Sequence, residues 1–337
     1  MKGNEAMAEA AIQAGCDAYF GYPITPQAEL LEWMARRMPE VGRVFIQAES
    51  ELGAANMALG AAAAGARVLV SSSSPGISLM GEAMSYMAGS ELPMVLINVM
   101  RGGPGLGSIQ PSQSDYFQAT KGHGHGDYRV PVLAPSSIPE SIELVATAFE
   151  LAERYRTPVM LLTDGILGQA MEPVELRFRE IPHTTPDWIL TGAKGREPRV
   201  VKSIHLRADD LEIHNQHLQA KYAEIREREV RWAAEDMDGA DYALVAYGTS
   251  ARVARTVVRR AREAASAPGS SARSLSGRSR RQSWRGERRS SRASWSSSCR
   301  PARWSRTSGL PSKGAAPWPS TDAWAATCRC PRRPWTR

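Results

Sequence analysis

A regular alternation of helical and strand patterns over residues 1–165 is the feature that most constrains the fold of this chain. Apolar side chains recur at helical spacing in residues 27–37, where Leu30, Leu31 and Met34 share one face, and short strand-like runs lie between such segments. Strands that alternate closely with helices pair in a parallel sheet that carries helices on both faces. We therefore predict an α/β fold, a doubly wound parallel sheet that binds its ligands where the strands end.

The predicted elements follow one another without long gaps. Asn4 is expected to cap the first helix, and Gly76 to precede a single helix that ends near residue 88. Residues 101–110 are expected to form a glycine-rich loop. Strands are predicted at 17–20, 44–47, 68–71, 93–99, 130–133 and 159–163, and further helices at 27–37, 51–64, 112–119 and 137–155.

Composition divides the 337 residues into four parts. Residues 1–167 form the predicted first domain. Residues 168–240, rich in proline and with a charged helical stretch, form a connecting arm. Residues 241–266 begin a second α/β domain with a strand, a Gly-Thr-Ser turn and a helix. Residues 267–337, called the tail below, differ in composition from all the residues before them. We therefore expect the second domain to be incomplete.

The tail does not have the composition of a folded or an ordinary disordered segment. Leu275 and Leu310 are its only aliphatic residues larger than alanine, yet it holds six of the nine tryptophans and sixteen serines. Disordered segments are poor in aromatic residues, although an RNA-binding arm would use them for stacking. The composition instead favours a GC-rich coding sequence translated out of frame, and we interpret the tail as the product of a frameshift that replaced the true C-terminal domain. We expect such an aberrant tail to be disordered.

Charge is distributed very unevenly. The formal net charge is +7, and the tail contributes fifteen Arg and one Lys against Glu287 and Asp322, or +14, which leaves −7 for residues 1–266. A basic chain would ordinarily indicate an anionic partner such as nucleic acid. Because the organised part is acidic, we predict that it does not bind nucleic acid.

Four cysteines and the hydropathy profile limit the remaining classes. No two cysteines form the Cys-x-x-Cys pair of iron-sulfur or zinc sites, and Cys328-x-Cys330 has no further Cys or His beside it. The longest apolar candidate, residues 57–70, is broken by Arg67 and is shorter than the roughly 18 residues of a membrane span. With no secretory pattern at its start, the chain is predicted to be cytoplasmic, with no membrane contact and no metal site of its own.

Common nucleotide and hydrolase motifs are missing. The chain contains no Gly-x-x-x-x-Gly-Lys-Ser/Thr loop, and no helix directly follows the Gly-rich run at residues 102–107, as a dinucleotide-binding fingerprint requires. The serines at 71–74 lack the Gly-x-Ser-x-Gly elbow of α/β hydrolases. Nicotinamide, nucleoside triphosphate and Ser-His-Asp chemistry are therefore disfavoured.

The segment Glu51-Leu-Gly-Ala-Ala-Asn-Met-Ala-Leu-Gly60 resembles the pyrimidine-domain helix of thiamine diphosphate enzymes. Residues 21–26, 73–80 and 101–105 are similar, in the same order and spacing, to segments of 2-oxoacid:ferredoxin oxidoreductases. The run from Gln110 to Tyr128 most resembles the alpha-type subunits of the members that use 3-methyl-2-oxobutanoate (2-ketoisovalerate). The resemblance implies a pyrimidine-binding first domain and a transketolase-C-like second one, and it ends near residue 265.

This resemblance assigns roles to individual residues. It implies that Glu51 hydrogen-bonds the N1′ atom of the cofactor and activates it, that Thr25 contacts substrate and cofactor, and that Arg101 grips the substrate carboxylate, for which a guanidinium fork is suited. Simpler alternatives stay open: a first-turn Glu stabilised by the helix dipole, a turn hydroxyl bonded to its own backbone, and a strand-end surface charge. Further implied cofactor-binding positions are Tyr22, Pro23, Ile24, Ser74, Pro75 and Gly76.

His123 and His125 form a His-x-His pair in a glycine-rich loop, where they could bind a metal or act as a general acid. Only Asp127 accompanies them, so we interpret them as loop residues near the mouth of the site.

Half of a thiamine diphosphate site is missing from the sequence. The Gly-Asp-Gly motif that usually binds Mg²⁺ and the diphosphate in this superfamily is absent, and Asp164-Gly165 is its nearest match. The resemblance therefore implies that a beta-type subunit supplies the diphosphate site with Mg²⁺, and that iron-sulfur clusters lie on partner subunits, with delta-type and gamma-type subunits and ferredoxin completing the system. The implied reaction is the coenzyme A-dependent oxidative decarboxylation of a 2-oxoacid. A non-oxidative, transketolase-like thiamine diphosphate enzyme and a catalytically dead interaction subunit remain alternatives.

Overall fold

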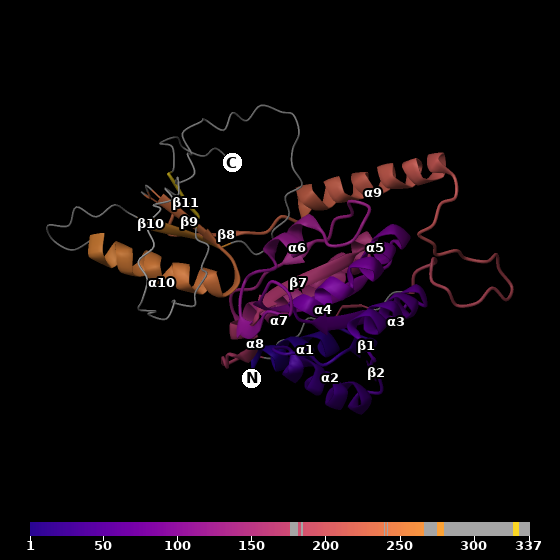
Figure 1. Cartoon of the computed structure of the whole chain (residues 1–337), viewed down its shortest axis with the longest axis horizontal. Helices are drawn as coiled ribbons and strands as arrows, with labels where there is room; N and C mark the ends of the chain where they lie inside the picture. The colour runs from indigo at the N-terminus through magenta and orange to yellow at the C-terminus, as the bar shows by residue number, and fades with distance from the viewer. Residues whose placement is uncertain are drawn as a thin grey trace, which may run out of the picture.

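A seven-stranded, mostly parallel sheet organises the first part of the computed structural model, as predicted (Figure 1). The structure describes residues 1–175, 181–182, 185–238, 240 and 242–265 and two strands in the tail. The strand order is β2-β1-β3-β4-β7-β6, with β5 paired to β4 alone. The parallel strands are β1 (Ala18–Gly21), β2 (Val44–Gln47), β3 (Val68–Ser72), β4 (Met94–Gly102), β6 (Val132–Leu133) and β7 (Pro158–Asp164); β5 (Ser108–Pro111) is antiparallel.

Helices cover both faces of this sheet, which confirms the doubly wound class. On one face α1 (Gly3–Gln13) packs against both α2 (Ala28–Glu40) and α7 (Ile138–Tyr155). On the other, α3 (Glu51–Ala63) packs against α4 (Ser74–Leu79) and α5 (Gly81–Ser90). Because both faces are covered, β3 and β7 are buried along their whole length, which explains the apolar runs at residues 68–70 and 158–162.

Small residues and caps determine where α3 lies. Ala54, Ala55, Ala58 and Ala62 are buried against the sheet, so the helix backbone approaches the strands closely. Ser50 has extended backbone angles, and its Oγ accepts a hydrogen bond from the Gly53 N–H at 3.0 Å. This cap fixes the first turn of α3 at the end of the sheet where β1 and β3 also terminate.

Three local predictions are corrected. Asn4 does not cap α1, which begins at Gly3, because its side chain is fully buried and donates to the Pro26 carbonyl and to Glu29. The predicted single helix ending near residue 88 is two helices, α4 and α5, that meet at Met80. The predicted loop 101–110 contains strand β5, which folds back on β4.

Shorter elements complete the first part and the arm. Helix α6 (Tyr116–Lys121) follows β5, and α8 (Gly165–Gln169) follows β7 directly. The arm contains α9 (Ala208–Arg228), which begins within one residue of the predicted charged helical stretch, residues 209–236, but ends eight residues before it. Among the described residues, no helix has both the length and the hydropathy that a bilayer crossing requires.

A second, smaller unit follows the arm. Strands β8 (Ala233–Glu235), β9 (Tyr242–Ala246), β10 (Leu275–Ser279) and β11 (Ala326–Arg329) form a sheet in the order β11-β9-β10-β8, beside α10 (Gly248–Ala265) in Figure 1. Since β9 and β10 are parallel and α10 packs against both, the predicted start of a second α/β unit is present. Both β10 and β11 belong to the tail; the prediction of disorder for its other residues lies outside the described part of the chain.

Candidate functional site

The chain order of the large sheet reverses beside β1, which has β2 on one side and β3 on the other. Doubly wound sheets bind ligands at such a reversal, because the loops leaving the neighbouring strands turn to opposite faces and open a crevice. Register places Gly21, at the end of β1, beside Ser71 of β3 and Gln47 of β2. The predicted site positions that follow β1, β2 and β3 therefore meet at one edge of the sheet. They are residues 22–26, Glu51 and residues 73–76.

Glu51 is the first residue of α3 and is buried, with 7% of its surface exposed. Within the described part of the chain its carboxylate has no hydrogen-bond partner. It lies against Gly76 of α4, where a Cβ would stand 2.7 Å from its Oε1. A carboxylate is costly to bury without a partner, so its placement favours a ligand that supplies one.

Two consecutive serines, Ser72 and Ser73, lie where β3 ends and α4 begins. The side chains of Ser72 and Ser73, at the end of β3, are buried, and neither hydroxyl is hydrogen-bonded in the described residues. A Cβ on Gly76 would also lie 2.1 Å from Ser72 Oγ. Glu51, Ser72 and Gly76 thus form a tight polar corner in which only glycine fits between the carboxylate and the hydroxyl.

Arg101, near the end of β4, is 5% exposed and is tied to the loop after β1. Its Nη1 donates to the Thr25 carbonyl at 2.9 Å and its Nη2 to the Leu106 carbonyl at 3.0 Å. The buried Nε has no partner in the described structure. Because a guanidinium has five N–H donors, these two bonds leave donors for an anionic ligand. The surface-charge alternative for Arg101 is wrong.

The backbone of Arg101 is held by two serines. Ser74 Oγ accepts from the Arg101 N–H at 3.0 Å and lies 3.2 Å from its carbonyl oxygen, and Ser114 Oγ donates to the same carbonyl at 3.0 Å. Ser74, predicted as a cofactor-binding residue, therefore joins the first turn of α4 to the strand that carries the arginine.

The loop of residues 22–26 rests on a buried hydrogen-bonded row beneath it. Tyr19 OH lies 2.7 Å from Ser71 Oγ, which donates to Gln27 Oε1 at 2.7 Å, and Gln27 Nε2 donates to the Tyr22 carbonyl at 3.1 Å. Burial raises the pKa of Tyr19, so this phenol stays protonated. Above the row Tyr22 and Ile24 are half-buried, whereas Pro23 and Thr25 are exposed.

Thr25 is close to Arg101 through its carbonyl, not its hydroxyl. No hydrogen bond of the Thr25 hydroxyl to any described residue occurs, so the alternative of a hydroxyl bonded to its own backbone is wrong. The structure brings the predicted residues together in two groups: Glu51 with Gly76, and Thr25 with Arg101 and Ser74. The first turn of α4, which contains Ser74, Pro75 and Gly76, joins the two groups.

The structure adds a buried pair that the sequence analysis missed. Asn98 in β4 is completely buried, and its Nδ2 donates to Asp115 Oδ2 at 2.9 Å. A single amide among the apolar residues 94–100 was the available signal. The pair anchors the start of α6 below Arg101.

The two loop histidines lie against α5. A Cβ on Gly81 would meet the His123 carbonyl at 2.6 Å, and the His125 carbonyl accepts from Ser85 Oγ at 2.8 Å. Burial lowers the pKa of His123, which favours its neutral form. Among the described residues no group of three or more His, Cys, Asp or Glu is arranged to hold a metal.

Asp164, the nearest match to a diphosphate motif, has its carboxylate fully engaged. Its Oδ1 accepts from the Ile166 and Leu167 N–H groups, both at 3.1 Å, and from Thr249 Oγ1 at 2.6 Å. Its Oδ2 accepts from the Thr249 N–H at 3.1 Å and from Gln113 Nε2 at 3.3 Å. This carboxylate caps α8 and joins the second unit to the first.

The fold and this edge define a doubly wound α/β protein with buried polar residues gathered at the sheet's topological switch point. A family model described as pyruvate flavodoxin/ferredoxin oxidoreductase, thiamine diphosphate-binding, matches residues 9–236, more than half of the chain. The chain belongs to this family, as an alpha-type subunit of the 2-oxoacid:ferredoxin oxidoreductases.

Two curated relatives and one solved structure illustrate the likeness. The chain is 53% identical over 264 residues to the ketoisovalerate oxidoreductase subunit VorB of Methanothermobacter thermautotrophicus, covering 78% of this chain and 75% of the relative. It is 38% identical over 261 residues to the 2-oxoglutarate synthase subunit KorA of Archaeoglobus fulgidus, covering 76% and 75%. The matched length is close to the number of residues that precede the tail.

The structural likeness is to a 2-oxoglutarate:ferredoxin oxidoreductase from Magnetococcus marinus with 2-oxoglutarate, coenzyme A and succinyl-CoA bound. The TM-score is 0.71 at 27% sequence identity, and the match covers 83% of this chain. This chain spans about half, 53%, of that longer chain.

Proposed function

We propose that this chain is the pyrimidine-binding subunit of a 2-oxoacid:ferredoxin oxidoreductase that carries out coenzyme A-dependent oxidative decarboxylation of 3-methyl-2-oxobutanoate. The observation that carries the proposal is the buried carboxylate of Glu51, which lies against Gly76 at the switch point of the sheet and has no hydrogen-bond partner among the residues that the structure describes. Its family supports the reaction class, and the name of the relative at 53% identity supports the branched-chain substrate.

The residues at the edge fit the aminopyrimidine end of thiamine diphosphate. When bound, this cofactor supplies the nucleophilic thiazolium carbon for decarboxylation. Glu51 would share a proton with the pyrimidine N1′ atom, and the Ser72 and Ser73 hydroxyls, which lack partners in the described residues, offer further hydrogen bonds. Gly76 allows the carboxylate and the Ser72 hydroxyl to pack closely against the first turn of α4. Tyr22, Pro23 and Ile24 would line the crevice from the loop above.

Arg101 is proposed to bind the carboxylate of the 2-oxoacid. Its two occupied nitrogens fix the direction of the guanidinium, while the buried Nε–H remains without an acceptor among the described residues. A charge-assisted hydrogen bond to a carboxylate would satisfy this donor. Thr25, whose carbonyl is bonded to the same guanidinium, would contact both substrate and cofactor.

The other half of the site is proposed to come from partner subunits. A beta-type subunit would hold Mg²⁺ and the diphosphate, and iron-sulfur clusters on partner chains would pass electrons to ferredoxin; delta-type and gamma-type subunits complete the assembly. The engaged carboxylate of Asp164 supports this division, because it has no free oxygen position for a metal ion. The cytoplasmic location predicted from the sequence stays a prediction.

A second substrate class, 2-oxoglutarate, is favoured by a specific observation. The relative at 38% identity is named a 2-oxoglutarate synthase subunit, and the solved structure has 2-oxoglutarate bound. The two substrates differ by a second carboxylate, so comparing the kcat/KM of the assembled enzyme for each acid decides between them.

The full chain should be coexpressed with a beta-type subunit, and reduction of methyl viologen that depends on 2-oxoacid and coenzyme A should be measured. We expect the Glu51→Gln variant to lose at least about 100-fold in turnover, which is the scale for removing a proton-transfer group. The matched control is Glu49→Gln, two residues earlier on an exposed position, which should retain activity. Near-normal turnover of Glu51→Gln would remove Glu51 from this role. Consumption of the 2-oxoacid without any viologen reduction would favour the non-oxidative alternative.

A further inference from the structure

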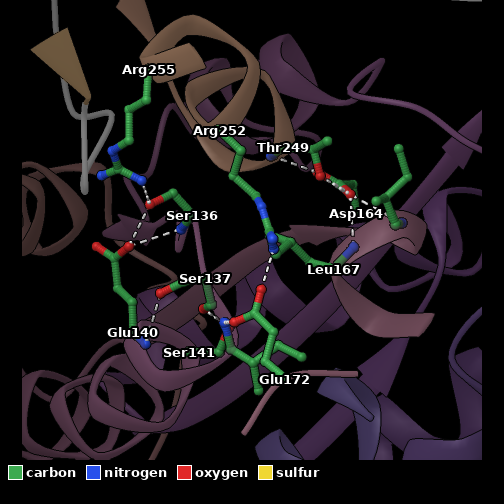
Figure 2. Close-up of polar contacts among 12 residues, drawn as sticks. Ser136, Ser137, Glu140, Ser141, Asp164, Leu167, Glu172, Thr249, Arg252 and Arg255 are labelled. Carbon is green, nitrogen blue, oxygen red and sulfur yellow. Dashed lines mark hydrogen bonds and ion pairs between the residues drawn. The ribbon is translucent and has the colours of Figure 1, made fainter. Parts of the chain in front are cut away.

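The turn at the start of α10 contacts the edge of the sheet that carries Arg101. Figure 2 shows three polar contacts from α10 to the first unit: Thr249 to Asp164, Arg252 to Glu172, and Arg255 to Ser136. The first of these contacts is the one nearest the proposed site, because Asp164 pairs in register with Met100, the residue before Arg101.

Gln113 completes this junction from the segment before α6. Its Nε2 donates to the Tyr247 carbonyl at 2.9 Å and to Asp164 Oδ2 at 3.3 Å, and its Oε1 accepts from Ser250 Oγ at 2.6 Å. Both ends of the Gln113 amide are therefore bonded to the turn that leads into α10. The rings of Tyr247 and Tyr116 add a contact, with centroids 5.9 Å apart.

Gly248 makes the close approach possible. Its φ is +57°, in the left-handed region that favours glycine, and a Cβ there would lie 2.6 Å from Gln113 Nε2 and 3.1 Å from Asp164 Oδ2. The backbone of the second unit thus comes within reach of both side chains only because this position has no side chain.

The two residues that follow Gln113 bind the arginine strand. Ser114 Oγ donates to the Arg101 carbonyl at 3.0 Å, and Asp115 accepts from the buried Asn98 at 2.9 Å. Three consecutive residues, 113 to 115, therefore connect the α10 turn, the Arg101 backbone and the middle of β4. A displacement of the turn would be transmitted to Arg101 through one short, multiply bonded segment.

We propose that Thr249, Asp164 and Gln113 are positioning residues through which the second unit sets the position of Arg101 for its anionic ligand. The proposal rests on the proposed function only for the identity of that ligand, a 2-oxoacid carboxylate. The coupling itself rests on the contacts of the described residues. This coupling gives the beginning of the second unit a role in the site, although the composition of the chain changes abruptly after residue 266.

The test uses the full chain and two variants. Thr249→Val retains the shape of the side chain and the backbone N–H but removes the hydrogen bond of the hydroxyl to Asp164. Gln113→Leu removes all three hydrogen bonds of the amide at similar volume. Amide hydrogen exchange is followed in residues 101–115. We expect exchange about tenfold faster in both variants, and wild-type exchange in Thr249→Ser, which retains the hydroxyl.

The matched control is Thr256→Val on the exposed face of α10, where the hydroxyl bonds only the Arg252 carbonyl. In the enzyme assembled with the beta-type subunit, we expect Thr249→Val to raise KM for the 2-oxoacid about tenfold, with KM for coenzyme A and kcat changed less than twofold. Thr249→Ser should restore KM. A thermal melt checks that each variant is folded.

Unchanged exchange of residues 101–115 in both variants would overturn the coupling. An active wild-type complex with unchanged 2-oxoacid KM in both variants would overturn the positioning of Arg101 while leaving the proposed function intact. An inactive wild-type complex would overturn the proposed function instead, and faster exchange would still support the coupling.

Discussion

The position of the Glu51 carboxylate depends on the absence of a side chain at Gly76. Gly76 lies between Ser72 Oγ and the Glu51 carboxylate, and a Cβ at this position would stand 2.1 Å from the first and 2.7 Å from the second. Both neighbours are buried and packed, so neither can move away cheaply. We expect Gly76→Ala to displace Glu51 and to lower turnover of the assembled enzyme about 100-fold, the scale assigned to losing its proton-transfer group. Steady-state kinetics with 2-oxoacid and coenzyme A measure this.

Gly60 provides the matched control for that substitution. It lies in α3 with no atom within 4 Å of a Cβ, so Gly60→Ala should leave turnover unchanged. Because alanine favours helix over glycine, it should also stabilise the chain by about 0.5–1 kcal/mol. Equal turnover of Gly76→Ala and wild type would show that the corner around Glu51 is not a binding site.

At the residue scale, the sequence indicated the candidate site residues better than it indicated their contacts. Glu51 and Arg101 were both singled out, and both are buried at the edge, which rules out the surface-charge alternative for Arg101. The bonds that hold Arg101 could not be predicted, because Ser74, Ser114 and Thr25 reach it from three separate elements. Sequence spacing gives no information on such long-range contacts.

At the scale of elements, a buried glutamate joins α1 to α2. The Glu9 carboxylate accepts from Gln13, from Trp33 Nε1 at 2.9 Å and from Arg37 Nε at 3.3 Å. Burial alone would raise the pKa of Glu9, but these hydrogen bonds outweigh it and hold the pKa below the ordinary value of 4.5. Its stabilising effect is therefore complete above pH 4.5 and is lost as the pH falls through the lower folded-state pKa.

Glu9→Gln should destabilise the chain at pH 7 by about 1 kcal/mol, because the amide makes weaker bonds to Arg37 and Trp33. The difference from wild type should shrink as the pH falls below 4.5, since the wild-type carboxyl becomes neutral as well. Urea unfolding followed by circular dichroism at pH 7 and pH 4 measures both values. Glu32→Gln, on the exposed side of α2, should show neither effect. A pH-independent difference would contradict the assignment to the charge of Glu9.

The order and type of the elements were predictable because each buried strand is short, apolar and followed by a helical period. Their ends were not always predictable. Asn4 has the residue type of a cap, but a contact with Pro26 and Glu29 across the α1–α2 interface determines its place. Strand β5 was missed because its pairing with β4 depends on the Gly-rich turn between them, where Gly105 and Gly107 take positive φ values.

At the scale of the whole molecule, the fold of the first domain could be predicted from the sequence, whereas the contact of the second unit with the site could not. The sheet of residues 18–164 contains its own core and follows directly from hydropathy. The second unit contributes to the edge of the site through Gly248 and Thr249, and nothing in the sequence pattern of 241–266 indicated that contact. The frameshift interpretation of the tail stays a prediction, which reading the nucleotide sequence in all three frames would test.

Charge separates the tail from the rest of the molecule, so the two should behave differently on a polyanion. The tail contributes +14 and residues 1–266 contribute −7. We expect the full chain to be retained on heparin at low salt and to elute as salt rises, since screening weakens the attraction of exposed charges. A chain ending at residue 265 should flow through, with a melting experiment to confirm that it is folded. Retention of this shorter chain would instead place an anion-binding surface on the α/β domain and favour the nucleic-acid alternative.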